Sequence, residues 1–308
     1  MNADAIVLDN LVKVFQEEDG GKITAVNRLS LRIKKGEIFS LVGPDGAGKT
    51  TTIRMMCGVL PVTEGTITLL GLDMKRQREE IKSHIGYLSQ KFSLYGDLTI
   101  DENIDFFAEI HRVRDFKARK EELLQFTRLA PFRDRLAARL SGGMKQKLAL
   151  ACTLVHTPDI IFLDEPTTGV DPVSRRDFWK ILSTLLKSGI TIVVTTPYLD
   201  EAERSSRVAL ISEGTLLMCD TPERVKNSFG YDVFEVICQN PRGAAEKVRG
   251  YIEKKNIQLF GDRLHLLQLK GRGNEEFVKT QLQQQGLSIQ SVRRIAPSLE
   301  DVFVSAIS

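Results

Sequence analysis

The hydrophobic and polar positions of the chain follow a strand period at its beginning and a helical period further on. Residues 6–14, 29–33 and 66–70 are predicted strands, with a polar tip at 17–21 between the first two. They predict a small antiparallel β subdomain. An apolar run at 38–42, with Ser40 as its one polar residue, is typical of a buried strand, and a helix over 50–57 follows and ends at Gly58.

Helical patterns dominate from Lys91 to about residue 158. Thr99 and Glu102 have the spacing of a capping box, and the apolar residues that follow them fall on one helix face. A second helix is predicted over about 116–129, and a third runs from 142 to His156. We therefore expect a helical subdomain over about 91–158, in which residues 91–136 form an insert.

Strands and helices alternate along the rest of the chain. Buried strands at 160–163 and 191–195, with a helix at 173–187 between them, favour a mostly parallel sheet, and a hairpin follows over 207–220. In the tail, predicted strands at 232–238, 264–269 and 288–295 and helices at 242–254 and 275–285 indicate a small α+β domain of ferredoxin-like type. The predicted domains are 1–230 and 231–308.

The loop between the strand at 38–42 and the helix at 50–57 has the G-x-x-x-x-G-K-[ST] pattern of a phosphate-binding P-loop. Its glycines let backbone N–H groups surround an anion, and the helix N-terminus adds partial positive charge. Lys49 can reach terminal phosphates, and the Thr50 hydroxyl can ligate Mg²⁺. The predicted nucleotide-binding residues are Gly43, Pro44, Asp45, Gly46, Ala47, Gly48, Lys49, Thr50 and Thr51.

Two adjacent carboxylates, Asp164 and Glu165, follow the buried strand at 160–163. Ligands of open α/β sheets lie beyond the carboxyl ends of the strands. Asp164 can hold Mg²⁺, directly or through water, and Glu165 can orient and deprotonate a water that attacks the γ-phosphate. A solvated acidic pair is the alternative, which a neighbouring P-loop disfavours.

Two further features each have a structural alternative. Ser141, Gly142 and Gly143 precede a helix, so they form either a second anion site without a lysine or a simple helix cap. Phe15 lies where an aromatic ring could stack on adenine, although its spacing favours a core phenylalanine.

Composition narrows the functional classes. The net charge of the 308 residues is only +3, which gives no electrostatic case for nucleic acid. No apolar run approaches the ~20 residues of a membrane span, and the N-terminus lacks the pattern of a signal peptide. Since Cys57, Cys152, Cys219 and Cys238 lack metal or redox spacing, they are predicted to be free thiols in a reducing cytosol.

The ordered set of P-loop, Gln90, Leu140-Ser141-Gly142-Gly143, Asp164-Glu165 and Asp171 resembles the nucleotide-binding subunit of ABC transporters. This resemblance covers residues 1 to about 230. Residues 297–303 look like part of the C-terminal extension of bacterial exporter ATPases of the daunorubicin-resistance and multidrug type. Residues 43–45 and 140–147 are similar to the tandem-ATPase branch of that group.

The resemblance implies an α/β ABC-type ATPase core that binds ATP and Mg²⁺. It implies a head-to-tail homodimer or heterodimer, in which Ser141, Gly142 and Gly143 of one subunit cap ATP on the other's P-loop. Gln90 would touch Mg²⁺ and the attacking water. The helical insert would dock on a separate polytopic permease at the cytoplasmic side of the membrane. ATP binding would close the dimer, and hydrolysis would reopen it.

The chain departs from this family where a histidine normally hydrogen-bonds the γ-phosphate. That position is Pro197, which offers no donor, and neither Thr196 nor Tyr198 replicates an imidazole. Losing one donor to transition-state charge costs about 10²–10³ in rate, so tight ATP binding with reduced hydrolysis is expected. An alternative is a nucleotide-gated clamp subunit that hydrolyses weakly. An ABC protein acting on ribosomes or DNA is disfavoured by the single cassette. Met144 and Asp45 also differ from the residues that are usual at these positions in the family, and these two departures are smaller.

Overall fold

The computed structural model describes residues 3–91, 94–250, 252–253 and 256–307. The chain divides into two compact units, Met1–Cys219 and Asp220–Ser308. The sequence pattern placed this boundary at 230, because the short helix α8 (Pro222–Asn227), which packs on α11 (Leu299–Ile307) in the second unit, was not predicted. Parts of three predictions lie outside the described residues: the first two residues of the N-terminus, 92–93 of the helical insert, and 251 and 254 of the helix expected at 242–254.

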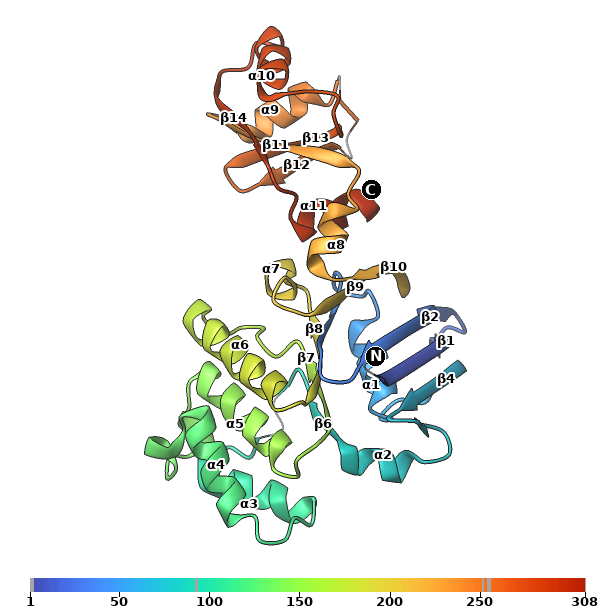
Figure 1. Ribbon diagram of the computed structural model, residues 1–308, viewed down its shortest axis with the longest axis vertical. Helices are drawn as coiled ribbons and strands as arrows, with labels where there is room; N and C mark the ends of the chain where they lie inside the picture. Colours follow the sequence, from blue (N-terminus) through green and yellow to red (C-terminus); the bar gives the residue numbers. More distant parts are fainter. Residues whose placement is uncertain (1–2, 92–93, 251, 254–255, 308) are drawn as a thin grey trace. The chain divides into compact units, whose positions relative to one another are not determined.

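Two β-sheets form the framework of the first unit (Figure 1). The predicted β subdomain is a four-stranded sheet of order β2-β1-β4-β5, in which all three neighbouring pairs are antiparallel. The second sheet has the order β10-β9-β3-β8-β7-β6. The strands are β1 (Asp4–Gln16), β2 (Lys22–Lys34), β3 (Ile38–Val42), β4 (Glu64–Leu69), β5 (Leu72–Asp73), β6 (Ile85–Leu88), β7 (Ile160–Asp164), β8 (Thr191–Thr196), β9 (Arg207–Ser212) and β10 (Thr215–Asp220).

The six-stranded sheet aligns the carboxyl ends of its central strands at one edge. Strand β3 pairs in parallel with β8 and β9, and β7 pairs in parallel with β8 and β6. Each of these strands is short and almost wholly buried, as expected when both faces are covered. The loops that leave β3, β6, β7 and β8 therefore meet on the same side of the sheet.

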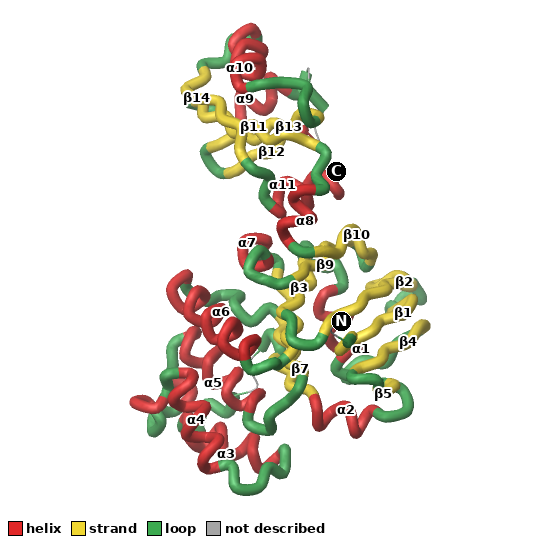
Figure 2. The backbone as a smooth tube through the Cα atoms, in the orientation of Figure 1, coloured by secondary structure: helices red, strands yellow, loops and turns green. Residues whose placement is uncertain are grey.

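Alternate residues of the buried strands pack into two separate cores. Ile161 and Leu163 face one core with helices α3, α4, α5 and α6, whereas Ile160 and Phe162 face the other with α1, α2 and the antiparallel sheet. Figure 2 shows these helices on opposite sides of the central strands. The helices are α1 (Lys49–Met56), α2 (Arg78–His84), α3 (Ile100–Ile110), α4 (Lys117–Thr127), α5 (Gly142–Leu154), α6 (Pro172–Lys187) and α7 (Leu199–Ala202), with short 3-10 turns at Ala130–Phe132 and Ala137–Arg139.

The second unit has a βαββαβ order and an antiparallel sheet of order β12-β13-β11-β14, which is the ferredoxin-like arrangement. Its short edge strand β12 was not predicted, because only four residues pair. The elements are β11 (Tyr231–Cys238), α9 (Pro241–Val248), β12 (Ile257–Phe260), β13 (Arg263–Leu269), α10 (Glu275–Gln284) and β14 (Ile289–Ile295), followed by α11. Helices α9 and α10 cover one face, where Phe234, Leu266 and Val278 are buried together.

Candidate functional site

The P-loop follows β3 and ends at Gly48, the N-cap of α1. Gly46 and Gly48 have φ angles of 81° and 93°, in the left-handed region that favours glycine. A Cβ on Gly43 would collide with the Ile211 carbonyl, and one on Gly48 with the Ala25 carbonyl. The loop is thus pressed against neighbouring strands, and it leads directly into the N-terminus of a helix.

Lys49 is 4% exposed, and its Nζ lies within the P-loop. It donates to the carbonyls of Gly43 at 2.9 Å and Pro44 at 3.0 Å, and it lies 3.3 Å from Glu165 Oε1. The side chain of Asp45 is 96% exposed, with its carboxylate 4.0 Å from the same Nζ. Asp45 therefore points outward, and its carboxylate does not fill the loop.

Asp164 is fully buried at the end of β7 and accepts three hydrogen bonds. Oδ1 accepts from Thr50 Oγ1 at 3.0 Å and from Thr195 Oγ1 at 2.7 Å, and Oδ2 accepts from Tyr87 at 3.4 Å. Burial raises the pKa of Tyr87 to about 12, so the phenol stays a donor. A carboxylate beside a P-loop threonine hydroxyl is an oxygen donor set that fits Mg²⁺, which takes its remaining ligands from phosphates and water.

Glu165 is 8% exposed, and its backbone has a φ of 47°. Left-handed backbone is rare for residues other than glycine and concentrates at functional sites. Its N–H donates to the Oγ1 of Thr195 at 2.9 Å. Its Oε2 accepts from Gln90 Nε2 at 2.9 Å and from Thr168 Oγ1 at 3.4 Å. Gln90, Thr168 and Lys49 therefore contact this carboxylate, while Thr195 holds its backbone N–H.

The segment after β8 carries Pro197 at the position where the resemblance predicts a histidine. Thr196 is fully buried, and its hydroxyl donates to Glu201 Oε2 at 3.1 Å and accepts from the Tyr198 N–H at 3.0 Å. Thr196 is therefore occupied elsewhere and cannot replace the histidine without breaking these bonds. The ring of Tyr198 lies beneath the Arg175 guanidinium, whose central carbon is 4.3 Å from the ring centroid.

Ser141, Gly142 and Gly143 lie at the start of α5, on the opposite face of the central sheet from α1. Ser141 is the N-cap, and its hydroxyl accepts from the Met144 N–H at 3.3 Å. A Cβ on Gly143 would collide with the side chain of Ser174 in α6. The structure therefore does not bring Ser141, Gly142 and Gly143 together with the P-loop of the same chain.

Phe15 lies near the end of β1, paired with Ile23 of β2, and it is 38% exposed. The ammonium of Lys13 lies 5.1 Å from its ring centroid, which is a cation–π contact. This exposure does not fit a core phenylalanine, so an aromatic face is available on the antiparallel sheet.

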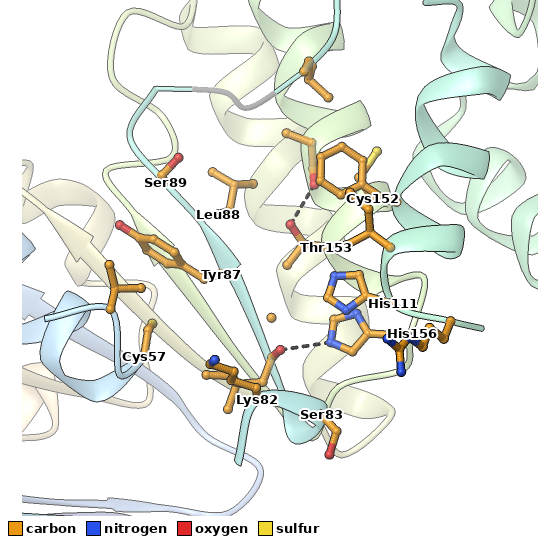
Figure 3. A pocket seen from close by; sticks show the side chains of 18 of the residues that line it. Cys57, Lys82, Ser83, Tyr87, Leu88, Ser89, His111, Cys152, Thr153 and His156 are labelled. Carbon is orange, nitrogen blue, oxygen red and sulfur yellow. Dashed lines mark hydrogen bonds between the residues drawn. The ribbon is translucent and has the colours of Figure 1, made fainter. Parts of the chain in front are cut away.

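A groove of about 640 Å³ is lined by β6 and by the neighbouring helices of the helical subdomain, and Figure 3 shows its walls. The rings of His111 and His156 stack there, 4.0 Å between centroids and 7° from parallel. Burial, together with the neighbouring His111, lowers the pKa of His156 to about 4, so this imidazole is neutral at pH 7. Tyr87 lines the same groove, and its hydroxyl contacts Asp164.

Several residues of the site had no signal in the sequence motifs. Thr195 contacts both acidic residues, Tyr87 contacts Asp164, and Thr168 contacts Glu165. The one available signal for Thr195 was its place at the carboxyl end of a buried strand. Tyr87 lies three residues before Gln90 and Thr168 three residues after Glu165, but neither belongs to a sequence pattern with a known mechanism.

These features define a P-loop nucleotide-binding site, and comparison with known proteins gives the family. The family model described as "ABC transporter" matches residues 26–168, and that described as "ATP-binding protein DrrA1-3-like, C-terminal domain" matches 221–307. The chain is 33% identical to daunorubicin resistance ATP-binding protein DrrA2 of Streptomyces coeruleorubidus, covering 94% of this chain and 92% of that protein. The chain therefore belongs to the ATP-binding proteins of ABC transporters.

Other relatives differ in length. The chain is 43% identical over 209 residues to the probable multidrug ABC transporter ATP-binding protein YbhF of Escherichia coli K12, but that match covers 67% of this chain and only 36% of YbhF. The dimeric, post-hydrolysis structure of the ATP-binding cassette MJ0796 with ADP and Pi has a TM-score of 0.64 and 27% identity. It covers 70% of this chain and 98% of that cassette. No helix in the described residues is long and apolar enough to cross a membrane.

Proposed function

We propose that this chain is the ATP-binding subunit of an ABC exporter and that its P-loop binds MgATP. The observation that carries the proposal is the cluster at the sheet edge, in which Lys49 lies 3.3 Å from Glu165 and Thr50 lies 3.0 Å from Asp164. In this proposal Lys49 binds the terminal phosphates, Glu165 orients and deprotonates water, and Asp164 with Thr50 holds Mg²⁺. The metal neutralises charge on the phosphates when it is bound. The full-length similarity to DrrA2 supports an exporter.

The proposal includes a second ATP-binding subunit. Ser141, Gly142 and Gly143 present a capped helix end without a lysine, on the opposite sheet face from α1. Such an end suits the phosphates of a nucleotide held by another subunit. The similarity to the dimeric MJ0796 cassette supports this arrangement. ATP binding then closes the dimer, and hydrolysis reopens it.

The proposal also includes a polytopic permease, with this chain peripheral at the cytoplasmic side of the membrane. In this proposal the permease docks in the groove beside β6 and the helical subdomain. A permease segment in this groove would contact Tyr87, whose hydroxyl reaches Asp164 at 3.4 Å, and would lie close to Gln90. The groove thus offers a short route between a bound permease and the residues of the nucleotide site.

A second candidate function is a clamp subunit that holds ATP and hydrolyses it slowly. Pro197 favours this candidate because it offers no donor, while the Thr196 hydroxyl is bonded to Glu201. In a heterodimer, the site on this P-loop would serve as the clamp and the other site would hydrolyse. The complete Lys49–Glu165–Gln90 set argues against a site with no hydrolysis.

One experiment tests the proposal. The chain is purified from membranes together with any bound subunits, and ATP binding and hydrolysis are measured with and without Glu165→Gln. We expect an integral membrane protein in the complex, saturable ATP binding by both forms, and hydrolysis that depends on Glu165. Absence of a membrane partner together with absence of ATP binding would contradict the proposal. Binding with hydrolysis equal in the two forms would favour the clamp.

A further inference from the structure

A second cluster of charged and polar side chains lies behind the nucleotide site, around Glu201 of α7. This carboxylate is 3% exposed. Its Oε2 accepts from Thr167 Oγ1 at 2.7 Å and from Thr196 Oγ1 at 3.1 Å, and its Oε1 accepts from Arg175 Nε at 2.8 Å. Three segments of the chain therefore meet on one buried carboxylate.

A buried charge is costly unless it is paired and hydrogen-bonded, and Glu201 meets both conditions. Arg175 of α6 supplies the opposite charge, and its guanidinium also covers the ring of Tyr198. Removing the carboxylate would leave the guanidinium without its ion-pair partner and two buried hydroxyls without their acceptor. The geometry of all three segments therefore depends on Glu201.

The two threonines that Glu201 holds are close neighbours of the residues at the nucleotide site. Thr196 follows Thr195, whose hydroxyl contacts Asp164 at 2.7 Å and the Glu165 N–H at 2.9 Å. Since successive residues of a strand point to opposite faces, Thr195 faces the acidic pair while Thr196 faces Glu201. Thr167 lies two residues after Glu165 and follows its left-handed turn.

We propose that Glu201, paired with Arg175, is a positioning residue for ATP hydrolysis. It fixes the position of the segment after β7, which carries Glu165, relative to the segment after β8, which carries Pro197. Anchoring by Glu201 matters more in this chain than in one with a histidine at 197, because Pro197 has no side-chain donor that could bond to the phosphate and so hold the segment in place. The inference rests on the proposed function and deepens it.

A positioning role predicts a loss of rate with little loss of binding. A misplacement of about 1 Å in a group that orients a reactant can cost about 10²-fold in rate. We expect Glu201→Gln to lower the single-turnover cleavage of bound MgATP by about 10- to 100-fold. The Kd for ATP should change by less than about twofold, because the P-loop contacts are not altered. Asp200→Asn, an exposed acid of the same helix, is the matched control.

The double-mutant cycle between Thr167 and Thr196 tests the connection directly. Thr167→Val and Thr196→Val each remove one hydroxyl, and each should lower the rate about three- to tenfold, as expected for the net contribution of one typical hydrogen bond. Because both act through Glu201, neither should lower the rate further when Glu201→Gln is already present. Thr167→Ser and Thr196→Ser keep the hydroxyl and should restore most of the rate.

The measurements use the full chain with any subunits that co-purify, radiolabelled MgATP for cleavage, equilibrium binding for Kd, and the thermal midpoint as a fold control. A Glu201→Gln rate equal to the wild-type rate would overturn the inference, as would a rate, an ATP affinity and a thermal midpoint that decline together. If Glu201→Gln does not fold, the cycle between Thr167→Val and Thr196→Val decides. Fully additive losses of rate in that cycle would also overturn the inference. A wild-type rate no higher than that of Glu165→Gln would instead reject hydrolysis in the proposed function.

Discussion

Each unit of the chain contains a buried carboxylate with several hydrogen-bond partners, and the two differ in where those partners come from. The carboxylate of Glu165 contacts Lys49, Gln90 and Thr168, which lie in separate segments at the carboxyl edge of a parallel sheet. Asp301 in the second unit is fully buried and is bound by His265 of β13 and by Ser298, three residues earlier.

The serine, histidine and aspartate of the second unit resemble a catalytic triad only by residue type. The Ser298 hydroxyl donates to Asp301 Oδ2 at 2.7 Å and accepts from the Asp301 N–H at 3.1 Å, so it caps α11. A triad needs the serine hydroxyl bonded to the histidine, which is not the arrangement here. Glu165 thus has among its partners a lysine that a bound phosphate could attract, whereas Asp301 is bound by a histidine and by the serine that caps its own helix.

The largest effect is expected for Glu165→Gln. The amide cannot accept a proton, and loss of a general base costs about 10²–10⁴ in rate. ATP binding should persist, because the P-loop and Lys49 are unchanged. Hydrolysis and ATP affinity are measured side by side in the purified complex. A variant that still hydrolysed ATP at the wild-type rate would remove Glu165 from the reaction.

Pro197→His should sharpen the contrast by adding the missing donor. A positioned donor to transition-state charge is worth about 10²–10³ in rate, so hydrolysis should rise toward that extent while ATP affinity changes little. Steady-state kinetics with saturating MgATP measures the gain. Tyr198→His, one residue further along, is the control, and an equal gain there would show that position 197 is not special.

Asp301→Asn should affect only the second unit. Burial alone would raise the pKa of Asp301, but hydrogen bonds from His265 and Ser298 outweigh burial and lower it. A lowered pKa gives stability that is present above the unfolded value of about 3.9 and is lost as the pH falls through the folded value. We expect Asp301→Asn to lower the free energy of unfolding by about 1–3 kcal/mol at pH 7. Below about pH 4 the difference from the wild type should shrink.

Calorimetry from pH 7 to pH 2 measures this difference. Trp179, the only tryptophan, lies in the first unit and reports on that unit separately by fluorescence. A pH-independent difference, or a shift of the tryptophan signal with unchanged calorimetry, would contradict a local role for Asp301.

The smallest effect is expected for Tyr87→Phe, which keeps the ring in the groove and removes one donor from Asp164. A hydrogen bond of this kind contributes about 1 kcal/mol, so the Mg²⁺ concentration for half-maximal ATP binding should rise about fivefold. A titration with Mg²⁺ at fixed ATP gives the value. Tyr95 is 49% exposed, and Tyr95→Phe should leave this Mg²⁺ concentration unchanged. Equal titration curves for wild type and Tyr87→Phe would show that the Tyr87 hydroxyl in the groove does not affect Mg²⁺ binding at Asp164.

The sequence predicted the parts of the molecule that are set by local patterns. The P-loop, the acidic pair, the capping box at Thr99 and the ferredoxin-like tail all depend on spacing over a few residues or on a short order of elements. The sequence missed α2, α8 and β12, because each is only four to seven residues long, which is too short for a hydrophobic period to show. It also missed Glu201, because the partners of this carboxylate lie up to 34 residues away along the chain.

The left-handed backbone of Glu165 has a consequence for how this protein could be made more robust. Glycine adopts that conformation at no steric cost, whereas a glutamate with a φ of 47° gives up about 1–3 kcal/mol. Selection for thermal resilience alone would therefore favour glycine at the position that we propose as the general base of hydrolysis. Directed evolution of this chain for heat tolerance, without a selection for turnover, should drift toward an inert form.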